Sequence, residues 1–322
     1  MKVILWIAAA LVLLLGAAYL GAGYYVYDTL STVKIYPGET FENTPANFVI
    51  LYDYAADFDT SPYWMPEFEV VTFPSREPGV TLSGWYVEAD PSAPAVVLTH
   101  GIGTGKIAGN ILLPAGMLYK NGFNVLIYDL RNHGTSDSDG GRTSVGNKEY
   151  MDVLGAWDYL VNGRGFDPER VGVFGVSLGG GSTMNAFAEE PRIPALLADS
   201  PFADLQQIIS EELVRTNYPT FLAPAGIISA RAIAGVDLLE HSPKDAVLNA
   251  GDRPMFIIHG VNDERVNVHH ARDLEALAQE TGANLTVWYV EDAKHVQSIF
   301  VQPEEYELKI ADFFRRTLSA GE

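Results

Sequence analysis

Hydrophobic and polar positions along this chain of 322 residues follow two patterns that alternate along the sequence. Short apolar runs rich in β-branched and aromatic residues predict strands, and segments with an apolar residue every three to four positions predict helices. The predicted strands are 68–73, 82–87, 95–99, 124–128, 171–175, 195–198, 255–259 and 285–290. The predicted helices are 108–120, 148–161, 182–190, 268–281 and 304–318.

This alternation indicates an α/β fold with a mostly parallel, eight-stranded sheet and helices on both faces. The first two strands have no helix between them, so we expect them to form an antiparallel hairpin at one edge. Residues 203–250 break the alternation, because they contain two predicted helices, 205–215 and 227–234, and no strand. Since an insertion at the carboxyl edge of such a sheet is placed to cover a site, we expect a small lid here over an apolar pocket. Ordinary packing is the alternative.

The N-terminus contains the longest apolar stretch. Residues 3–27 carry no charge and suffice to cross a bilayer as a helix, and four tyrosines gather at the distal end as in an interfacial aromatic belt. We therefore expect a transmembrane anchor at 1–27, a connector at 28–66 and an α/β domain at 67–322 with its lid at 203–250.

A cleaved signal peptide is the alternative to the anchor, and it would make the protein secreted. The small residues 16–18 offer a weak cleavage site. Lys2 precedes the apolar stretch, and Asp28, Glu39 and Glu42 follow it, with only Lys34 as an opposing charge. By the positive-inside rule, this charge distribution favours a cytoplasmic N-terminus in the cell membrane and an α/β domain on the extracytoplasmic side.

Composition excludes several classes of function. The net charge of −20 disfavours nucleic acid or an anionic lipid surface as a partner. The absence of cysteine excludes disulfides, thiolate metal sites and a cysteine nucleophile. Gly101 and Gly103 are followed by Lys106 where a dinucleotide-binding motif has its third glycine. We expect neither a metal nor a cofactor, and we interpret the acidic segment 137–139 as a solvated loop rather than a calcium site.

Gly175-Val176-Ser177-Leu178-Gly179 lies between a predicted strand and a predicted helix. A serine between two glycines at such a turn is typical of a nucleophile elbow, where flanking side chains would clash. The pentapeptide occurs by chance in roughly one chain in ten of this length. It therefore becomes informative only if an acid and a histidine follow in that order.

Both residues follow in the required order. Asp263 comes after the strand at 255–259, and His295 lies between the last strand and the last helix. We expect Ser177 to be the nucleophile, His295 its general base and Asp263 the carboxylate that orients the histidine. Asp199, at the end of the preceding strand, is the alternative acid.

An oxyanion hole requires two backbone donors near Ser177. The N–H of Leu178 follows the nucleophile at a helix N-terminus, and Ile102 lies in the glycine-rich loop after the strand at 95–99. We expect these two groups to bind the oxyanion. His100 and His133 stand beside glycines in loops, where we expect them to make structural hydrogen bonds.

Further motifs carry a family resemblance. Asp129-Leu130-Arg131-Asn132-His133-Gly134-Thr135-Ser136 resembles the D-x-R-G-H-G-x-S segment of many α/β hydrolases, with asparagine in place of the first glycine. Residues 143–146, followed by Glu149 and Asp152, and residues 199–202 resemble a membrane-anchored bacterial branch related to serine aminopeptidase-like and acylglycerol-lipase-like hydrolases. The resemblance covers about residues 67–318 and implies the α/β-hydrolase fold, the triad and the oxyanion hole.

The expected function is therefore hydrolysis of carboxylic esters through an acyl-enzyme intermediate. The anchor and the apolar lid favour acyl-lipid or other hydrophobic small-molecule esters as substrates. A thioesterase or an aminopeptidase-like peptidase is the alternative, in which Glu211 or Glu212 would hold a peptide amino terminus. A non-catalytic anchored binding domain is a second alternative, although it has no need for a complete Ser/Asp/His set.

Overall fold

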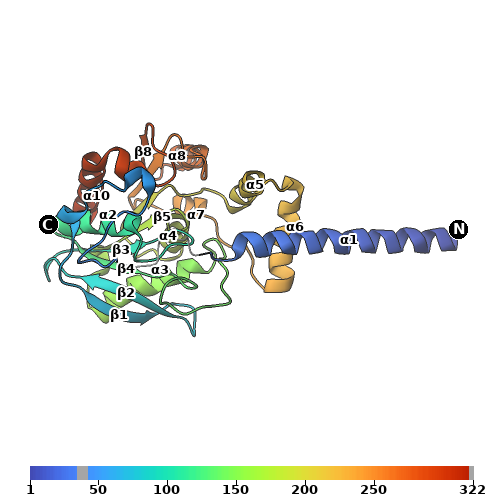
Figure 1. Cartoon of the computed structure of the whole chain (residues 1–322), viewed down its shortest axis with the longest axis horizontal. Coiled ribbons are helices and arrows are strands. Elements are labelled where there is room, and N and C mark those ends of the chain that lie inside the picture. The colour runs from blue at the N-terminus through green and yellow to red at the C-terminus, as the bar shows by residue number, and fades with distance from the viewer. Residues whose placement is uncertain (35–42, 319–322) are drawn as a thin grey trace.

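A long N-terminal helix projects from an α/β body in the computed structural model (Figure 1), which describes residues 1–34 and 43–318. The helix, α1 (Lys2–Ser31), is joined to the body along its last turns. Two of the acidic residues expected to flank the anchor, Glu39 and Glu42, lie outside the described residues.

The body contains one eight-stranded sheet with the order β1-β2-β4-β3-β5-β6-β7-β8. Strands β1 and β2 form the expected antiparallel edge hairpin, β2 also pairs antiparallel with β4, and the remaining pairs are parallel. The α/β fold predicted from the alternating pattern is confirmed. The strands are β1 (Glu69–Pro74), β2 (Thr81–Val87), β3 (Ala95–Thr99), β4 (Asn124–Tyr128), β5 (Val171–Val176), β6 (Leu196–Asp199), β7 (Met255–Gly260) and β8 (Leu285–Val290).

Helices cover both faces of this sheet. Alternate strand residues enter two separate cores, as Val96 and Val97 of β3 do, which is why the parallel strands are mainly apolar. One core also holds α2 (Gly109–Lys120), α9 (Ser298–Val301), α10 (Pro303–Thr317) and residues of 48–65, where two 3₁₀ turns occur, η1 (Asp53–Ala55) and η2 (Ser61–Tyr63). The other core holds α3 (Glu149–Asp158), α4 (Leu178–Glu189), α7 (Lys244–Leu248) and α8 (His269–Thr281).

The bounds of α4 and α3 differ from the prediction by several residues. Helix α4 begins at Leu178, four residues before the predicted start. Helix α3 ends at Asp158 and continues as the π-helical turn η3 (Tyr159–Gly163), and the 3₁₀ turn η4 (Pro168–Arg170) precedes β5. The early start of α4 matters for function, because it places the helix N-terminus directly after Ser177.

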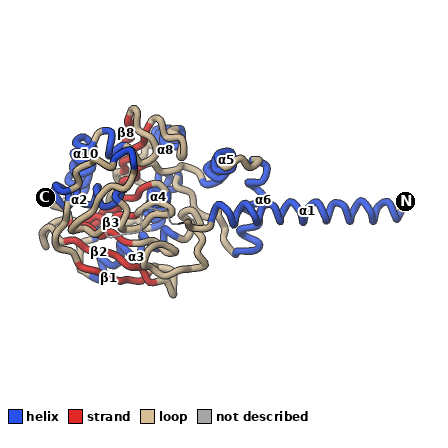
Figure 2. Tube along the Cα trace, in the orientation of Figure 1, coloured by secondary structure: helices blue, strands red, loops and turns tan. Residues whose placement is uncertain are grey.

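The part of the β6–β7 segment at residues 205–234 is helical, as predicted, and lies beside α1 rather than over the sheet (Figure 2). It contains α5 (Leu205–Arg215), the 3₁₀ turn η5 (Thr220–Leu222), α6 (Ala223–Ser229) and the π-helical turn η6 (Ala230–Ala234). The second predicted helix therefore starts four residues early, at Ala223, with Pro224 in its first turn. The lid was predicted at 203–250, but α7 at its end packs in the core, so from here on the name is used for residues 205–234 only.

Helix α1 has an exposed half and a packed half. It is the one helix in the described residues that is long and apolar enough to cross a membrane. Residues 1–18 are exposed, and packing against the lid begins at Tyr19. Cleavage at the weak site at residues 16–18 would remove only the exposed half of the helix. Tyr19–Ser31 therefore stays on the folded domain under both the anchor and the signal-peptide interpretation.

Candidate active site

Ser177 occupies the turn between β5 and α4 at the carboxyl edge of the sheet. Its backbone has φ of 55° and ψ of −118°. A non-glycine residue in such a conformation costs roughly 1–3 kcal/mol, and it persists only where the surrounding structure enforces it. The strained turn is the local geometry expected of a nucleophile elbow.

The glycines on both sides of Ser177 are required by close backbone approaches. A Cβ atom at Gly175 would overlap the carbonyl group of Gly179. A Cβ atom at Gly179 would in turn overlap the carbonyl oxygens of Thr99 and His100. The first turn of α4 therefore lies directly against the end of β3 and the loop that follows it.

His295 lies between Ser177 and Asp263. Its Nδ1 atom is 2.7 Å from Oδ2 of Asp263, and its Nε2 atom is 2.9 Å from Oγ of Ser177. With Asp263 ionised, Nδ1 donates to the carboxylate and Nε2 accepts from the serine hydroxyl. This is the tautomer in which an imidazole can take up the serine proton.

The loop after β7 fixes the orientation of the Asp263 carboxylate, which is buried. Its Oδ1 atom accepts hydrogen bonds from the backbone N–H groups of Arg265 at 2.8 Å and Val266 at 2.9 Å. The other oxygen, Oδ2, is thereby directed at His295. The neighbouring His259, which is also buried, donates from Nε2 to the carbonyl of Val266 at 2.8 Å and so holds the same loop.

Asp199, the alternative acid, has other partners. One carboxylate oxygen is 2.9 Å from the hydroxyl of Ser200, and the other is 2.8 Å from the hydroxyl of Tyr306. Complete burial raises the pKa of Asp199 to about 6. The geometry favours Asp263 over Asp199 as the partner of His295.

The loop after β3 lies against the nucleophile. A Cβ atom on Gly101 would be 3.4 Å from Cβ of Ser177, so the loop backbone and the serine are in near contact. Ile102 of this loop and Leu178 at the start of α4 both line the space beside Ser177. The two residues predicted to supply oxyanion donors are therefore on the same side of the site.

Two buried histidines hold that loop in place. His100 Nε2 accepts from the N–H of Leu130 at 3.0 Å, and His133 Nε2 accepts from the N–H of Gly103 at 3.1 Å. Their Nδ1 atoms then donate to backbone carbonyls. Burial lowers the pKa of both rings, that of His100 to about 3, so both are neutral. The structural role predicted for these histidines agrees with the hydrogen bonds.

Asn132 replaces glycine in the motif because it closes the following loop. Its φ of 64° is a left-handed conformation that asparagine tolerates better than most residues. Its side-chain oxygen accepts from the N–H groups of Asp139 at 2.6 Å and Gly141 at 3.0 Å, and its Nδ2 donates to the carbonyl of Arg142 at 2.8 Å. Glycine offers none of these bonds.

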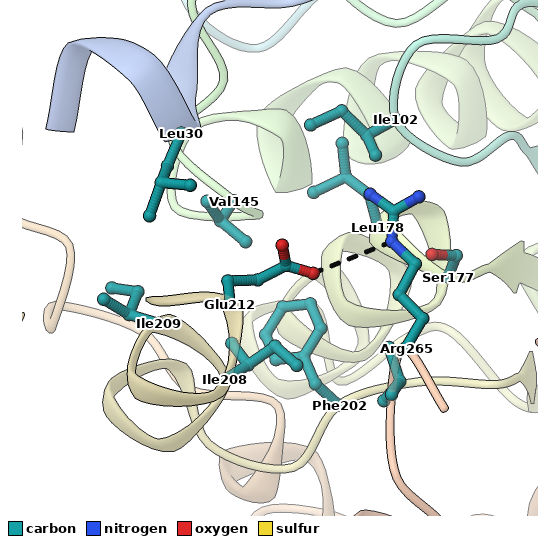
Figure 3. Close-up of a pocket in the computed structure, with 11 residues that line it drawn as sticks. Leu30, Ile102, Val145, Ser177, Leu178, Phe202, Ile208, Ile209, Glu212 and Arg265 are labelled. Atoms are coloured by element: carbon teal, nitrogen blue, oxygen red, sulfur yellow. Dashed lines mark ion pairs between the residues drawn. The ribbon is translucent and has the colours of Figure 1, made fainter. Parts of the chain in front are cut away.

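A cavity of about 620 Å³ of empty space, including its mouth, opens above Ser177 (Figure 3). Glu212 and Arg265 form the charged part of its wall, 3.7 Å apart. Sequence reasoning did not identify most of the lining, which comprises Leu30, Ile102, Val145, Leu178, Phe202, Ile208, Ile209, Glu212, Arg265 and Val266 around Ser177.

Val145 is held in this wall by a strained loop. Its φ of 53° is unusual for a β-branched residue. Glu149 stabilises the loop by accepting hydrogen bonds from Thr143, Ser144 and Gly146 at 2.5–3.0 Å. Burial by itself raises the pKa of Glu149, but these hydrogen bonds outweigh it and hold the pKa below its usual value. The family-like segment 143–149 therefore positions a pocket residue.

The two lid glutamates differ in position. Glu212 lines the cavity, whereas the carboxylate of Glu211 lies 2.7 Å from Nε2 of His269 and 3.0 Å from Nε2 of His270 on α8. The ligand atoms of Glu211, His269 and His270 lie within 4.8 Å of one another, a grouping able to hold a metal ion that sequence reasoning missed. In the acidic loop, Asp137 accepts from the N–H of Thr81 and Asp139 pairs with Lys148, as a structural loop would.

Comparisons with known proteins agree with this architecture. The sequence model of the prolyl oligopeptidase family matches residues 115–321. The esterase Pf2001 of Pyrococcus furiosus is 26% identical, with a TM-score of 0.65 over 85% of this chain and 99% of that chain. An acylaminoacyl peptidase of Pyrococcus horikoshii has the same fold, with 19% identity and a TM-score of 0.57 over 80% of this chain and 42% of that one.

Among curated proteins, the thiohydrolase aneE of Aspergillus aculeatus is 27% identical over 188 residues, which are 57% of this chain and 58% of that protein. The chain thus spans between half and three fifths of the length of the curated relatives reported first. The family and its structural relatives support a serine hydrolase of ester or peptide type. With a match over more than half its length, the chain belongs to the prolyl oligopeptidase family, within the α/β-hydrolase superfamily.

Proposed function

We propose that this protein hydrolyses carboxylic esters with hydrophobic acyl groups, using Ser177 as nucleophile. The hydroxyl oxygen attacks the acyl carbonyl while His295 takes its proton, and Asp263 stabilises the resulting imidazolium. His295 then returns the proton to the leaving alkoxide. Water, activated by the same histidine, releases the acid from the acyl-enzyme. The observation that carries the proposal is the hydrogen-bonded chain Ser177–His295–Asp263 at the floor of an apolar cavity.

The tetrahedral intermediate carries a negative charge that needs donors already in position. We assign this role to the backbone N–H groups of Leu178 and Ile102, which flank Ser177 in the cavity wall. The N-terminus of α4 adds a favourable dipole at Leu178. Loss of one such donor typically costs about 2.7–4 kcal/mol of transition-state stabilisation. The loop after β3, which His100 and His133 hold in place, is thus part of the proposed oxyanion hole.

The apolar character of the cavity supports a hydrophobic acyl group. Within its lining, Glu212 and Arg265 supply the charged side chains, and they form an ion pair with each other. Such a wall favours an uncharged chain over a charged substituent, because burying an unpaired charge is costly. Lipid or other membrane-derived esters fit this surface and the apolar helix beside it.

We further propose that α1 anchors the enzyme in the cell membrane, with the body on the extracytoplasmic side. The length and hydropathy of α1 support a membrane span, and the charges around it support the orientation. In this arrangement residues 1–27 form the anchor, 28–66 the connector and 67–322 the catalytic domain with its lid. A cleaved N-terminus would give a secreted enzyme instead.

Turnover of p-nitrophenyl butyrate by the full-length protein and by Ser177→Ala tests the proposal. We expect the variant to lose at least about 10³-fold in kcat and to lose labelling by a fluorophosphonate probe. Ser210→Ala, which removes an exposed hydroxyl from α5, is the matched control and should retain both. Unchanged turnover in Ser177→Ala excludes the assignment. A wild-type protein that neither turns over the ester nor reacts with the probe would instead be a binding domain.

A peptidase or thioesterase is the second candidate. Glu212 in the cavity wall is an acidic group that can hold a peptide amino terminus, although it must then exchange its contact with Arg265. Matched ester, thioester and aminoacyl substrates distinguish these activities. If the peptidase interpretation holds, Glu212→Gln will weaken turnover of aminoacyl substrates and leave simple esters unaffected.

A further inference from the structure

A second apolar cavity lies beside the one above Ser177, along helix α1. It comprises about 370 Å³ of empty space, including its mouth, and shares three wall residues with the first cavity, namely Leu30, Val145 and Ile209. Its remaining wall comes from the last turns of α1, from α6 and from nearby loop residues, including Val26, Ile227 and Leu238. The two spaces therefore lie next to each other between the nucleophile and the junction of α1 with the lid.

Helix α1 is fixed against the body at this point. Its last residue, Ser31, accepts a 2.7 Å hydrogen bond from the N–H of Thr143, and the side chain of Asp28 forms an ion pair with Arg142. Val26 and Tyr27 are buried. The end of α1 is thus as much a part of the cavity wall as the sheet-borne loops are.

The helix also packs closely against the lid. A Cβ atom at Gly23 would overlap the backbone of Ala225, which shows that α1 and α6 cross with their backbones in near contact. The hydroxyl of Tyr19 donates to the carbonyl of Phe221 at 2.8 Å, and the hydroxyl of Ser229 donates to the carbonyl of Leu20 at 3.0 Å. The lid therefore follows α1 from Leu30 up to Tyr19.

With α1 inserted as the proposed anchor, its length would place this junction at a lipid surface. Residues 1–18, all of them exposed, rise about 27 Å, close to the roughly 30 Å hydrocarbon thickness of a bilayer. The packed half begins immediately afterwards, where the Phe221 ring stacks on Tyr19. Phe221 and Ile233 of the lid are exposed by 64% and 60% although both are apolar. Exposed apolar side chains beside a membrane-length helix fit a contact with lipid.

We propose that the second cavity is a subsite for the distal part of a long acyl chain, drawn from the lipid surface that α1 enters, with α1 as a permanent wall of the subsite. The inference rests on the proposed ester hydrolysis at Ser177. The ester carbonyl lies at Ser177, the proximal chain fills the first cavity, and the chain continues past Ile209 and Leu30 toward Ile227. A substrate bound in this way is selected by acyl length.

Ile227→Trp in the full-length, detergent-solubilised protein tests the subsite, because the larger side chain fills the second cavity alone. We expect kcat/KM for p-nitrophenyl palmitate to fall at least tenfold and that for p-nitrophenyl butyrate to stay within twofold. Ile228→Trp is the matched control, since Ile228 is exposed and lines neither cavity. An unchanged palmitate-to-butyrate ratio in Ile227→Trp overturns the proposal.

A binding measurement separates this inference from the proposed chemistry. Diazirine-bearing palmitic acid, added to full-length Ser177→Ala in lipid nanodiscs, should label the α1 segment around Val26 and the α6 segment around Ile227. Labelling confined to other parts of the chain overturns the subsite. It does so whatever effect Ile227→Trp has on the turnover of the two esters. If the wild-type protein cleaves neither ester but this labelling occurs, the proposed hydrolysis fails and the acyl subsite stands.

Discussion

Replacing Asp263 by asparagine tests which carboxylate orients the proposed general base. In the wild-type protein, Oδ1 of Asp263 accepts two backbone N–H groups and Oδ2 faces His295. An asparagine keeps its carbonyl oxygen toward the two donors, so its NH₂ group faces Nδ1 of His295. That ring nitrogen must then accept, and the proton moves to Nε2, which points at Ser177. A histidine in this tautomer cannot take up the serine proton.

The size of the effect follows from the cost of turning the amide around. Turning it restores the productive tautomer but leaves the N–H groups of Arg265 and Val266 without their acceptor, at about 1–3 kcal/mol each. The total of roughly 2–6 kcal/mol corresponds to a loss of about 30-fold to 10⁴-fold in kcat. The active tautomer therefore persists only as a minor population.

The assay is kcat for p-nitrophenyl butyrate, with Asp199→Asn as the matched control. Asp199 hydrogen bonds to Ser200 and Tyr306, so its replacement should change kcat by less than about threefold. The reasoning is refuted if Asp263→Asn keeps kcat within tenfold of wild type while Asp199→Asn loses a hundredfold. That result would transfer the orienting role to Asp199.

Three further predictions concern the pH dependence of stability, the close contact at Gly179 and the role of α1. Because burial raises the folded-state pKa of Asp199 to about 6 from 3.8, the folded state binds the extra proton, and wild-type stability falls as pH rises through this window. Between pH 5 and pH 7.5 the free energy of unfolding of the wild-type protein should therefore fall by about 1 kcal/mol more than that of Asp199→Asn, as measured by thermal unfolding. An equal pH dependence in the two proteins contradicts this prediction. Gly179→Ala should lower kcat at least a hundredfold, because its methyl group would overlap the carbonyls of Thr99 and His100 and displace the loop after β3. A wild-type kcat in this variant would contradict this reasoning. Deleting residues 2–18 should leave butyrate turnover within about threefold, whereas deleting residues 2–31 should lower Tm markedly, since buried Val26 and Tyr27 are lost; equal Tm values for the two deletions argue against a structural role for the end of α1.

The sheet was predictable because its strands are buried on both faces. Strands such as β3 and β4 are buried at every position and mainly apolar, and their bounds agree with the prediction residue for residue. The proposed site residues could be predicted from the sequence for a related reason. Parallel strands all end at one edge, so the loops that carry Ser177, Asp263 and His295 had to converge there once the chain order was known.

The start of α4 was missed because glycine disfavours helices. Gly179, Gly180 and Gly181 follow the nucleophile, and three glycines in succession predict a loop. Two of them are needed inside the helix for close contacts, since a Cβ atom at Gly179 meets the carbonyls after β3 and one at Gly181 meets the ring of Phe202. Tertiary packing therefore overrides local propensity at the point where function needs a helix N-terminus.

The cavity wall was hidden for a different reason, because it joins parts of the chain with no sequence relation to one another. The apolar residues of α1 look alike whether they face lipid or protein, so nothing in the pattern separates Val12 from Val26. Helix α1 contains three glycines, Gly16, Gly21 and Gly23, but only Gly23 lies at a close crossing, and its partner Ala225 lies 202 positions away. Only the folded chain shows that Leu30 reaches the site.

The segment 143–149 connects these observations. Its first residue binds the end of α1 through the N–H of Thr143, Glu149 braces its loop, and Val145 projects into both cavities. The N–H of Thr143 donates to the carbonyl of Ser31 at 2.7 Å, and the N–H of Val145 donates to Oγ1 of Thr143 at 2.9 Å, so we expect a displacement of α1 at Ser31 to shift Val145. Interiors packed at native density transmit such shifts rather than absorb them. The resemblance of this segment to membrane-anchored hydrolases thus has a physical counterpart, because the same residues that shape the pocket also hold the apolar helix.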